Sequence, residues 1–297
     1  MEKGKKARFQ ELLRADKLIV APGAYDAFSA RLVEQAGFPA VYISGAWAAS
    51  SRLGVPDIGL ATMSEVLDTA KNVVSATNIP VICDVDTGYG NALNVMRTVN
   101  EFERVGVAAI QIEDQIMSKK AGHIEGQKLI TKEEMVKKIE AAKSARRSND
   151  FVLIARTDAI GVNGFEDAID RARAYFQAGA DVLFVEAPRT REEMQSITEI
   201  FSEVPVMINI VEGGRTPVLK VEELESLGFR IAIFPASACS AAIKAIQGVL
   251  RELKEKGSTD GFTENMLPLK EMFELVGLSH YRELERKYVN FQPGVVK

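Results

Sequence analysis

The stretch VICDVDTG (residues 81–88) joins an apolar run to two carboxylates and a glycine. Successive side chains of a β-strand point to opposite faces, so alternate residues form two separate sets. One set is wholly apolar and consists of Val81, Cys83 and Val85. The other set ends in Asp84 and Asp86. The pattern predicts a buried strand whose outer face meets helices and whose inner face carries carboxylates at its carboxyl end.

Seven further runs of similar length and apolar character recur along the chain, with amphipathic stretches between them. These runs are KLIVAPG (17–23), AVYISG (40–45), AAIQIED (108–114), FVLIARTD (151–158), DVLFVEAP (181–188), VMINIVEGG (206–214) and IAIFPAS (231–237). Eight strands that alternate with helices predict an α/β fold, the closed (β/α)8 TIM barrel. An open doubly wound sheet is the alternative, but the chain has eight regular units and no GxGxxG segment.

Length and composition fit one barrel domain over residues 1–297, with a C-terminal helical extension over about 262–297. Of the 297 residues 46% are hydrophobic and 26% charged, and the formal net charge is −4. No basic stripe predicts a nucleic-acid partner, and no apolar run approaches the roughly 20 residues that span a membrane. The two cysteines, Cys83 and Cys239, form no disulfide framework or zinc pattern, and no signal peptide is recognisable. We therefore expect a cytoplasmic protein.

The same alternation places polar side chains on the inner face near the carboxyl ends of the other predicted strands. They are Tyr42, Ser44, Gln111, Glu113, Arg156, Glu186 and Asn209. An isolated aspartate at a strand end is usually a loop or cap residue, but Asp84 and Asp86 have Glu113 in phase on the next strand. Converging carboxylates repel one another, and a hard cation relieves this, so we expect Mg²⁺ here, or Mn²⁺ in its place. Arg156 would offer a planar fork to a substrate carboxylate.

Two connections are longer than a barrel requires, residues 46–62 and residues 115–131. The segment after each barrel strand begins at the catalytic face. We therefore expect both segments to cover the site as lids, with Gly122 and Gly126 as hinges of the second.

Nine short motifs follow one another in order along the chain. They are APGAYDAFSARL (21–32), YISG (42–45), LGVPDIGL (53–60), DVDTGYG (84–90), QIEDQ (111–115), KKAGHIEGQKL (119–129), ARTDA (155–159), FVEAP (184–188) and NIVEGGRTP (209–217). Together they resemble the isocitrate lyase/phosphoenolpyruvate mutase superfamily, in its short branch. Each motif is weak alone, but their joint order and spacing are specific and cover nearly the whole chain.

The resemblance implies a Mg²⁺-dependent carbon–carbon lyase that acts on a small 2-oxo or 2-hydroxy carboxylic acid through an enolate-like intermediate. It also implies a homotetramer in which a C-terminal helix is exchanged between subunits. By similarity, the metal would be held by Asp84, Asp86 and Glu113. Substrate-binding positions would be Tyr42, Ser44, Gly45, Ala46, Asp57, Lys120, Gly122, Arg156, Asn209 and Glu212. Catalytic positions would be Ala121, His123, Arg156 and Glu186.

Residue 121 departs from the pattern of the family. Its lyases usually carry KKCGH or KRCGH on the second lid, where the cysteine protonates the leaving fragment. This chain reads KKAGH over residues 119–123, and the methyl group of Ala121 cannot exchange a proton. Two explanations are open: a substitution introduced to inactivate the enzyme, or a natural variant with altered chemistry.

A second departure concerns the substrate. VEGGRTP (211–217) resembles the dimethylmalate lyase and petal-death group, and Ser240 stands where methylisocitrate lyases are expected to carry an arginine. We therefore expect a dicarboxylate, either a 2-alkylmalate such as 2,3-dimethylmalate or oxaloacetate. The alternatives are a methylisocitrate lyase, an oxaloacetate decarboxylase, an enzyme like carboxyphosphonoenolpyruvate phosphonomutase, and a relic that binds without turnover.

Overall fold

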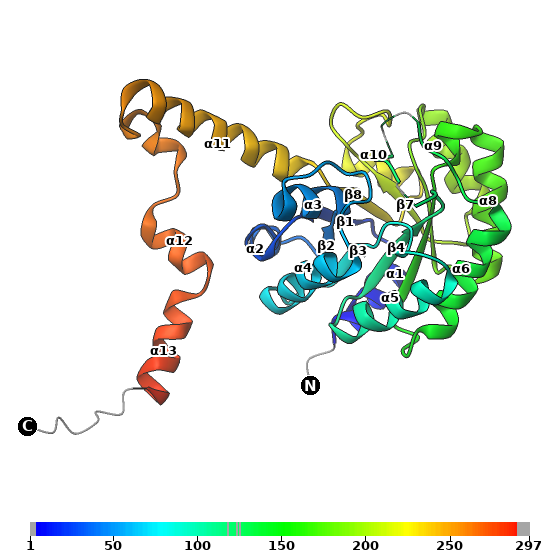
Figure 1. The fold of residues 1–297 in the computed structure, drawn as a ribbon, viewed down its shortest axis with the longest axis horizontal. Coiled ribbons are helices and arrows are strands. Elements are labelled where there is room, and N and C mark those ends of the chain that lie inside the picture. The colour runs from blue at the N-terminus through cyan, green and yellow to red at the C-terminus, as the bar shows by residue number, and fades with distance from the viewer. Residues whose placement is uncertain (1–3, 118, 123, 125, 290–297) are drawn as a thin grey trace, which may run out of the picture. The chain divides into compact units, whose positions relative to one another are not determined.

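Eight parallel strands close into a barrel in the first of two compact units, Met1–Ser240 (Figure 1). The computed structural model describes residues 4–117, 119–122, 124 and 126–289. The strands are β1 (Ile19–Ala24), β2 (Val41–Ile43), β3 (Val81–Asp84), β4 (Ala109–Glu113), β5 (Val152–Thr157), β6 (Val182–Val185), β7 (Val206–Asn209) and β8 (Ile231–Phe234). Each pairs with its neighbour in sequence and β8 pairs with β1, which confirms the predicted TIM barrel.

Helices connect and surround the strands. In this unit they are α1 (Lys5–Arg14), α2 (Ala27–Gln35), α3 (Gly45–Leu53), α4 (Met63–Ala76), α5 (Ala92–Arg104), α6 (Lys132–Ala145), α7 (Ala159–Val162), α8 (Phe165–Ala178), α9 (Arg191–Ile200) and α10 (Val221–Ser226). Several begin with side-chain caps, as where Thr62 and Glu65 form a capping box at the start of α4. Phe9 and Leu13 of α1 pack into the interior cluster that includes Ile19 of β1.

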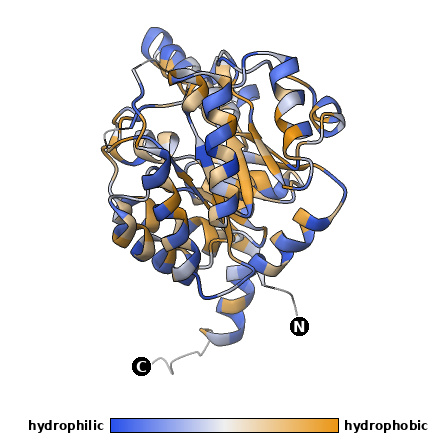
Figure 2. Ribbon diagram, turned by 90° about the vertical axis from the view of Figure 1, so that its right-hand side faces the viewer, coloured by the Kyte–Doolittle hydropathy of each residue, from blue (hydrophilic) through white to orange (hydrophobic). Residues whose placement is uncertain are grey.

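Alternation along the strands divides the apolar residues into two layers. One cluster fills the barrel interior and includes Tyr42, Ile82, Ile154, Phe184 and Met207. The other lies between strands and helices and includes Val81, Cys83, Val85, Val73 and Phe102. In Figure 2 the central strands of this unit are correspondingly coloured hydrophobic. The inner and outer sets predicted for residues 81–85 are therefore both present.

The strands end earlier than the predicted runs. β3 ends at Asp84, and the following backbone reaches φ 48° at Asp86, which is left-handed rather than extended. Ala187 likewise has φ 57° just beyond β6. Asp86 therefore reaches the mouth of the barrel from a turn, and strand alternation does not orient it.

The second compact unit, Ala241–Lys297, is helical. Its elements are most of α11 (Ser237–Lys256), the 3₁₀ segment η1 (Asp260–Asn265), α12 (Leu269–Leu275) and α13 (Leu278–Tyr288). In α11, apolar residues at helical spacing are exposed, among them Ile243, Ile246, Leu250 and Leu253. Across the described residues of both units, none of the helices has the length and apolar character needed to cross a membrane.

Candidate active site

A cavity of about 170 Å³ opens at the carboxyl ends of the strands. Its polar and charged lining comprises Tyr42, Ser44, Asp57, Asp84, Lys119, Arg156 and Asn209. The remaining lining residues are Ala46, Trp47, Ala121, Gly122, Val211, Ile233, Pro235 and Ala236. Most of the positions predicted from strand alternation and from the motifs thus meet in one place, although they are spread over nearly 170 residues of sequence.

Two aspartates present carboxylate oxygens to the same small space. Asp84 Oδ1 accepts hydrogen bonds from the Asp86 amide (3.0 Å) and from Gln111 Nε2 (3.2 Å). A Cβ atom at Gly45 would lie 3.0 Å from Asp86 Oδ1 and 3.1 Å from Asp84 Oδ2, so a side chain there would crowd both oxygens. Asp86 Oδ1 is buried, and the only charged group that meets it among the described residues is the Lys119 ammonium, at 2.9 Å. The glycine leaves this space open beside two oxygen donors.

Burial makes the negative charge of these groups costly. Burial and, after it, the Asp86 carboxylate raise the pKa of Asp84, Lys119 and Arg156 lower it, and the net result is a pKa of about 6. Burial also raises the pKa of Glu113 well above its ordinary value, although Arg156 and Lys119 oppose the shift. The acidic side chains therefore favour a cation at the mouth of the barrel.

Lys119 supplies one such cation. Its side chain is 4% exposed, and its Nζ pairs with Asp57 and lies 2.9 Å from Asp86 Oδ1. Burial alone lowers the pKa of Lys119, but the carboxylates of Asp86, Glu113, Asp84 and Asp57 outweigh it and the net shift is upward. Lys119 therefore stays charged and joins the second lid to the first.

The carboxylates at the barrel mouth suit a hydrated metal ion better than a fully protein-bound one. Among the described residues, no three His, Cys, Asp or Glu side chains converge closely enough to hold an ion by themselves. Mg²⁺, however, usually keeps several waters and needs only one or two carboxylates. Asp86 Oδ1 and Asp84 Oδ2, which both border the open space beside Gly45, fit such a hydrated ion, and the Lys119 ammonium now lies 2.9 Å from the first of them. Glu113 is less directly placed, because its two oxygens meet Gln115 Nε2 (3.1 Å) and Arg156 Nε (3.6 Å).

Arg156 lies among carboxylates on the inner face of β5. Its Nε and Nη2 donate to the two oxygens of Asp158 at 2.9 and 2.7 Å. On its other edge Nη1 meets, among the described residues, the Glu186 carboxylate, whose Oε2 lies 3.9 Å away. The guanidinium also stacks 5.2 Å from the centre of the Phe184 ring. One edge of the predicted fork is thus used by the protein and the other remains for a ligand.

Behind Arg156, a fully buried carboxylate fixes the turn that carries Asp158. The oxygens of Asp114 accept hydrogen bonds from Thr157 Oγ1 (2.7 Å), the Asp158 amide (3.0 Å), Tyr175 OH (2.7 Å) and Arg171 Nη1 (3.3 Å). Asp114 Oδ2 accepts three of these bonds and Oδ1 accepts the fourth, so donors from β5, the turn after it and α8 hold the carboxylate and support the site.

The second lid lies folded over the cavity. Gly122 approaches the floor so closely that a Cβ atom would lie 2.4 Å from Arg156 Nη2 and 2.7 Å from Glu186 Cγ. Gln127 holds this arrangement, since its Nε2 donates to the Gly122 carbonyl (3.0 Å) and to Asp158 Oδ1 (3.2 Å). The Ala121 side chain lines the cavity and its carbonyl accepts from the Ile124 amide (2.9 Å). The lid is therefore tied to the partner of Arg156.

The structure does not bring every predicted residue into the cavity. Glu186 is buried beneath Gly122 and accepts from Asn209 Nδ2 at 3.1 Å, so these two form the floor. Lys120 instead places its Nζ within 2.7 Å of where a Cβ of Gly126 would stand. Glu212 is exposed and accepts a hydrogen bond from Ser237 Oγ. His123 lies outside the described residues.

Three residues of the site were not among those predicted. Lys119 rather than Lys120 reaches the carboxylates, and only the folded lid decides between two adjacent lysines. Asp158 follows Arg156 by two residues, so the alternation that placed Arg156 inward would have found it. Gln127 carried no signal in the sequence, because its role depends on how the lid folds back on itself at Gly122 and meets Asp158 on another loop.

A family model described as phosphoenolpyruvate phosphomutase matches residues 9–254. The chain belongs to this family. The superfamily resemblance found in the motifs is thereby confirmed. The 2,3-dimethylmalate lyase of Eubacterium barkeri is 47% identical over 282 residues, covering 95% of this chain and 97% of that protein. A 2-methylisocitrate lyase of Aeropyrum pernix is 44% identical, over 92% and 88% of the two chains.

Solved structures are similar over the same length. Oxaloacetate acetylhydrolase in complex with 3,3-difluorooxalacetate has a TM-score of 0.91 and 37% identity, and the match covers 96% of this chain and 97% of the other. A phosphonopyruvate hydrolase complex with oxalate and Mg²⁺ has a TM-score of 0.88 and 32% identity, covering 97% and 100%. Family members with this barrel therefore include a protein solved with a metal and a two-carbon dicarboxylate.

Proposed function

We propose that this protein is a Mg²⁺-dependent carbon–carbon lyase that cleaves a 2-hydroxy dicarboxylate. The substrate is a 2-alkylmalate such as 2,3-dimethylmalate, or oxaloacetate, which gains the C2 hydroxyl when water adds to its carbonyl. The observation that carries the proposal is that Asp84 Oδ2, Asp86 Oδ1 and the open edge of Arg156 lie together at one barrel mouth. The similarity to a 2,3-dimethylmalate lyase over almost the full length supports it.

Different residues would bind the carboxylate, the C2 oxygen and the alkyl group of the substrate. Ser44 stands at the amino end of α3 with no side-chain cap, so the first amides of that helix are available to a carboxylate. Arg156 Nη1 would hold the same carboxylate from β5. Mn²⁺ or Mg²⁺ bound beside Asp84 and Asp86 would stabilise negative charge on the adjoining oxygen as a Lewis acid. The apolar wall would accept the alkyl group and consists of Trp47, Val211, Ile233, Pro235 and Ala236.

The cleavage requires a proton that this chain does not obviously provide. As the hydroxyl proton leaves, the C2–O bond becomes a carbonyl, the C2–C3 bond breaks, and its electron pair passes to C3. C3 must then be protonated to give the second acid. Ala121 lines the cavity on the lid and offers only a methyl group. We therefore expect binding to be intact and turnover to be slow.

A dicarboxylate fits the charges of the cavity better than a tricarboxylate. Lys119 and Arg156 are the cationic side chains in the lining, and Lys119 is already paired with Asp57 and Asp86. A methylisocitrate lyase would need a further cation for the third carboxylate. Oxaloacetate decarboxylation is the second candidate, because the loss of CO₂ needs no acid on the lid and Ala121 is then no defect.

The proposed reaction is tested by incubating the protein with Mg²⁺ and 2,3-dimethylmalate, methylisocitrate or oxaloacetate, and following the products by NMR. We expect slow release of a 2-oxo acid from the alkylmalate, abolished by EDTA. Calorimetry should show that oxalate binds only when Mg²⁺ is present. Absence of Mg²⁺-dependent oxalate binding would refute the metal and carboxylate site whatever the turnover.

We also propose that the protein is a cytoplasmic homotetramer. The exposed apolar residues of α11, Ile243, Ile246, Leu250 and Leu253, support exchange of C-terminal helices within a homotetramer. Two free, buried thiols, Cys83 and Cys239, support a cytoplasmic location. Sedimentation analysis should give the mass of four chains, and a monomer at micromolar concentration would contradict the exchange.

Replacing Asp158 by asparagine should weaken oxalate binding roughly 10- to 100-fold, the cost of losing a charge-assisted hydrogen bond. The asparagine amide would point N–H groups at Nε or Nη2 of Arg156, which now donate to Asp158. Asp181→Asn is a matched control, because Asp181 also holds an arginine, Arg146, at 2.6 Å, before β6 begins. We expect the control to lower Tm and leave oxalate affinity unchanged. Equal losses in both variants would mean that Asp158 acts only through stability.

A further inference from the structure

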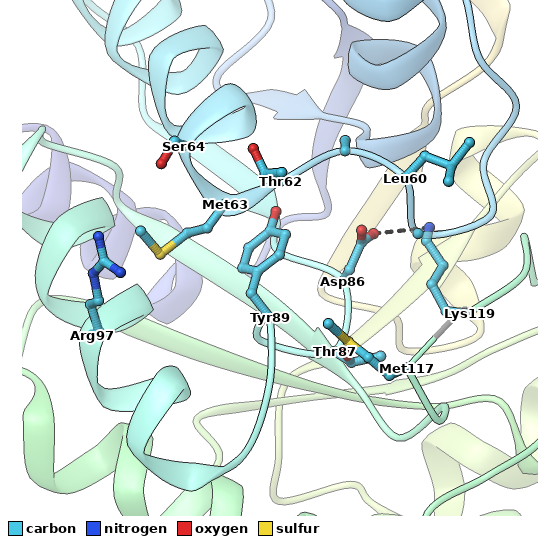
Figure 3. A pocket seen from close by; sticks show the side chains of 12 residues that line it. Leu60, Thr62, Met63, Ser64, Asp86, Thr87, Tyr89, Arg97, Met117 and Lys119 are labelled. Atoms are coloured by element: carbon cyan, nitrogen blue, oxygen red, sulfur yellow. Dashed lines mark hydrogen bonds and ion pairs between the residues drawn. The ribbon is translucent and has the colours of Figure 1, made fainter.

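A second cavity, of about 310 Å³, adjoins the first and shares Lys119 with it (Figure 3). It is enclosed by residues 59–64 before and at the start of α4, by residues 86–89 after β3, and by side chains from α5 and the second lid. Lys119 lines both cavities, and its ion pair with Asp86 stands at the edge of the second one. The larger cavity shares Asp86 and Lys119 with the site described above, and its other lining residues take no part in the proposed function.

Tyr89 lines this cavity with a strained backbone and an unsatisfied hydroxyl. Its backbone has φ 61°, a left-handed conformation that bulky residues rarely adopt. Its hydroxyl is buried and makes no hydrogen bond within the described residues. In Figure 3 the hydroxyl points toward Thr62 and Met63 across the space. Backbone strain and an unsatisfied buried hydroxyl at one residue both call for an explanation, and a ligand that accepts the hydroxyl proton provides it.

Arg97 contributes a positive charge to the same lining. It projects from α5, is exposed, and has no carboxylate within ion-pair distance among the described residues. Lys119 differs in being neutralised by Asp57 and Asp86. The cavity therefore offers one cationic side chain, Arg97, that no carboxylate of the described residues neutralises, which matches a ligand with a single negative charge.

The remaining walls are largely apolar. Leu60, Ala61, Met63 and Met117 line the space between Arg97 and Lys119. Thr87 Oγ1 donates to Met117 Sδ at 3.7 Å, which leaves that wall without a strong donor. A guanidinium and a phenol at one side with aliphatic and thioether groups around them match a carboxylate attached to a short hydrocarbon chain.

We propose that this second cavity is a binding site for a short-chain monocarboxylate, separate from the metal and 2-oxo acid site. Tyr89 and Arg97 recognise the carboxylate, and the apolar wall takes the chain. The inference rests on the proposed function in one respect: cleavage of a 2-alkylmalate yields a 2-oxo acid and a monocarboxylate. Both products could then be bound at once, one in each of the two cavities that Lys119 lines.

Propionate is the probe, titrated by calorimetry into the full-length protein that holds Mg²⁺ and saturating oxalate. We expect propionate to bind while oxalate stays bound. Tyr89→Phe should weaken propionate roughly 3- to 10-fold through one lost hydrogen bond, and Arg97→Gln roughly 10-fold or more. Arg104→Gln is the matched control, because Arg104 lies on the same helix but pairs with Glu101 outside the cavity.

Three results would overturn the site: no propionate binding at millimolar concentration, displacement of propionate by oxalate, or unchanged affinity in both cavity variants. The proposed function fails differently, through absence of Mg²⁺-dependent oxalate binding or of cleavage. If cleavage is absent but propionate still responds to Tyr89→Phe and Arg97→Gln, the monocarboxylate site stands without the lyase.

Discussion

Asp84→Asn is expected to abolish activity and, in metal-free protein, to raise the melting temperature. The asparagine oxygen can still accept from the Asp86 amide and from Gln111 Nε2, so the local hydrogen bonds persist. What is lost is a carboxylate that the metal needs, and we expect turnover to fall about 10³-fold or more. The substitution also removes a buried carboxylate whose ionisation destabilises the fold.

The pH dependence gives the sign of the stability change. Burial raises the pKa of Asp84 from 3.8 to about 6 in the folded protein. A carboxyl with a raised folded pKa stabilises the fold below its unfolded pKa, and this contribution is lost as pH rises through about 6. A shift of this size corresponds to about 3 kcal/mol at pH 7. An asparagine cannot ionise and avoids that loss.

Melting curves in EDTA between pH 4 and pH 8 measure the effect. Wild-type protein should become less stable as pH rises through this range, and Asp84→Asn should lose only part of that slope, because burial also raises the pKa of Asp158 to about 6. At pH 7 the variant should melt roughly 5–10 °C higher. Asp68→Asn, on the exposed face of α4, should change neither slope nor activity. A variant that melts lower at pH 7, or that stays active, contradicts the assignment of Asp84.

The barrel was predictable because its signal is local and repeated. Eight apolar runs, each of strand length, impose eight strands, and helical stretches between them require parallel pairing. The residue at which each strand ends was not predictable, because the backbone soon turns left-handed, as at Asp86 and Ala187. Asp86 reached the site through that turn and not through strand alternation.

The side chains on the strands of the site were predictable, whereas the existence of the second lid was predictable but its contacts were not. Asp84, Arg156 and Asn209 lie on strands, where alternation fixes the side-chain direction. Lys119 and Gln127 lie on a loop whose course depends on contacts with Asp86 and Asp158. No periodicity distinguishes Lys119 from Lys120. Only the folded course of the loop determines which of the two ammonium groups meets Asp86.

Ala121→Cys is expected to increase cleavage of a 2-alkylmalate by about 10² to 10⁴, the usual contribution of a positioned general acid. The backbone at this position is held by the hydrogen bond from the Ile124 amide and by Gln127 on the Gly122 carbonyl. The new thiol would therefore enter the cavity along the direction of the present methyl group. Oxalate affinity should stay unchanged, because Arg156, the amino end of α3 and the metal-binding oxygens are untouched.

Ala121→Ser separates acid catalysis from mere filling of space, since a hydroxyl of nearly the same size is a far weaker acid than a thiol. Single-turnover rates with 2,3-dimethylmalate, measured for the three proteins at pH 7, should rank cysteine far above serine and alanine. Strong decarboxylation of oxaloacetate by the Ala121 protein, with no gain from cysteine, would show that decarboxylation is the native chemistry. If no form turns over any substrate and none binds oxalate with Mg²⁺, the chain is a relic of its family. A large gain with cysteine and not with serine leaves one interpretation, that the barrel and its floor are intact and only the proton is missing.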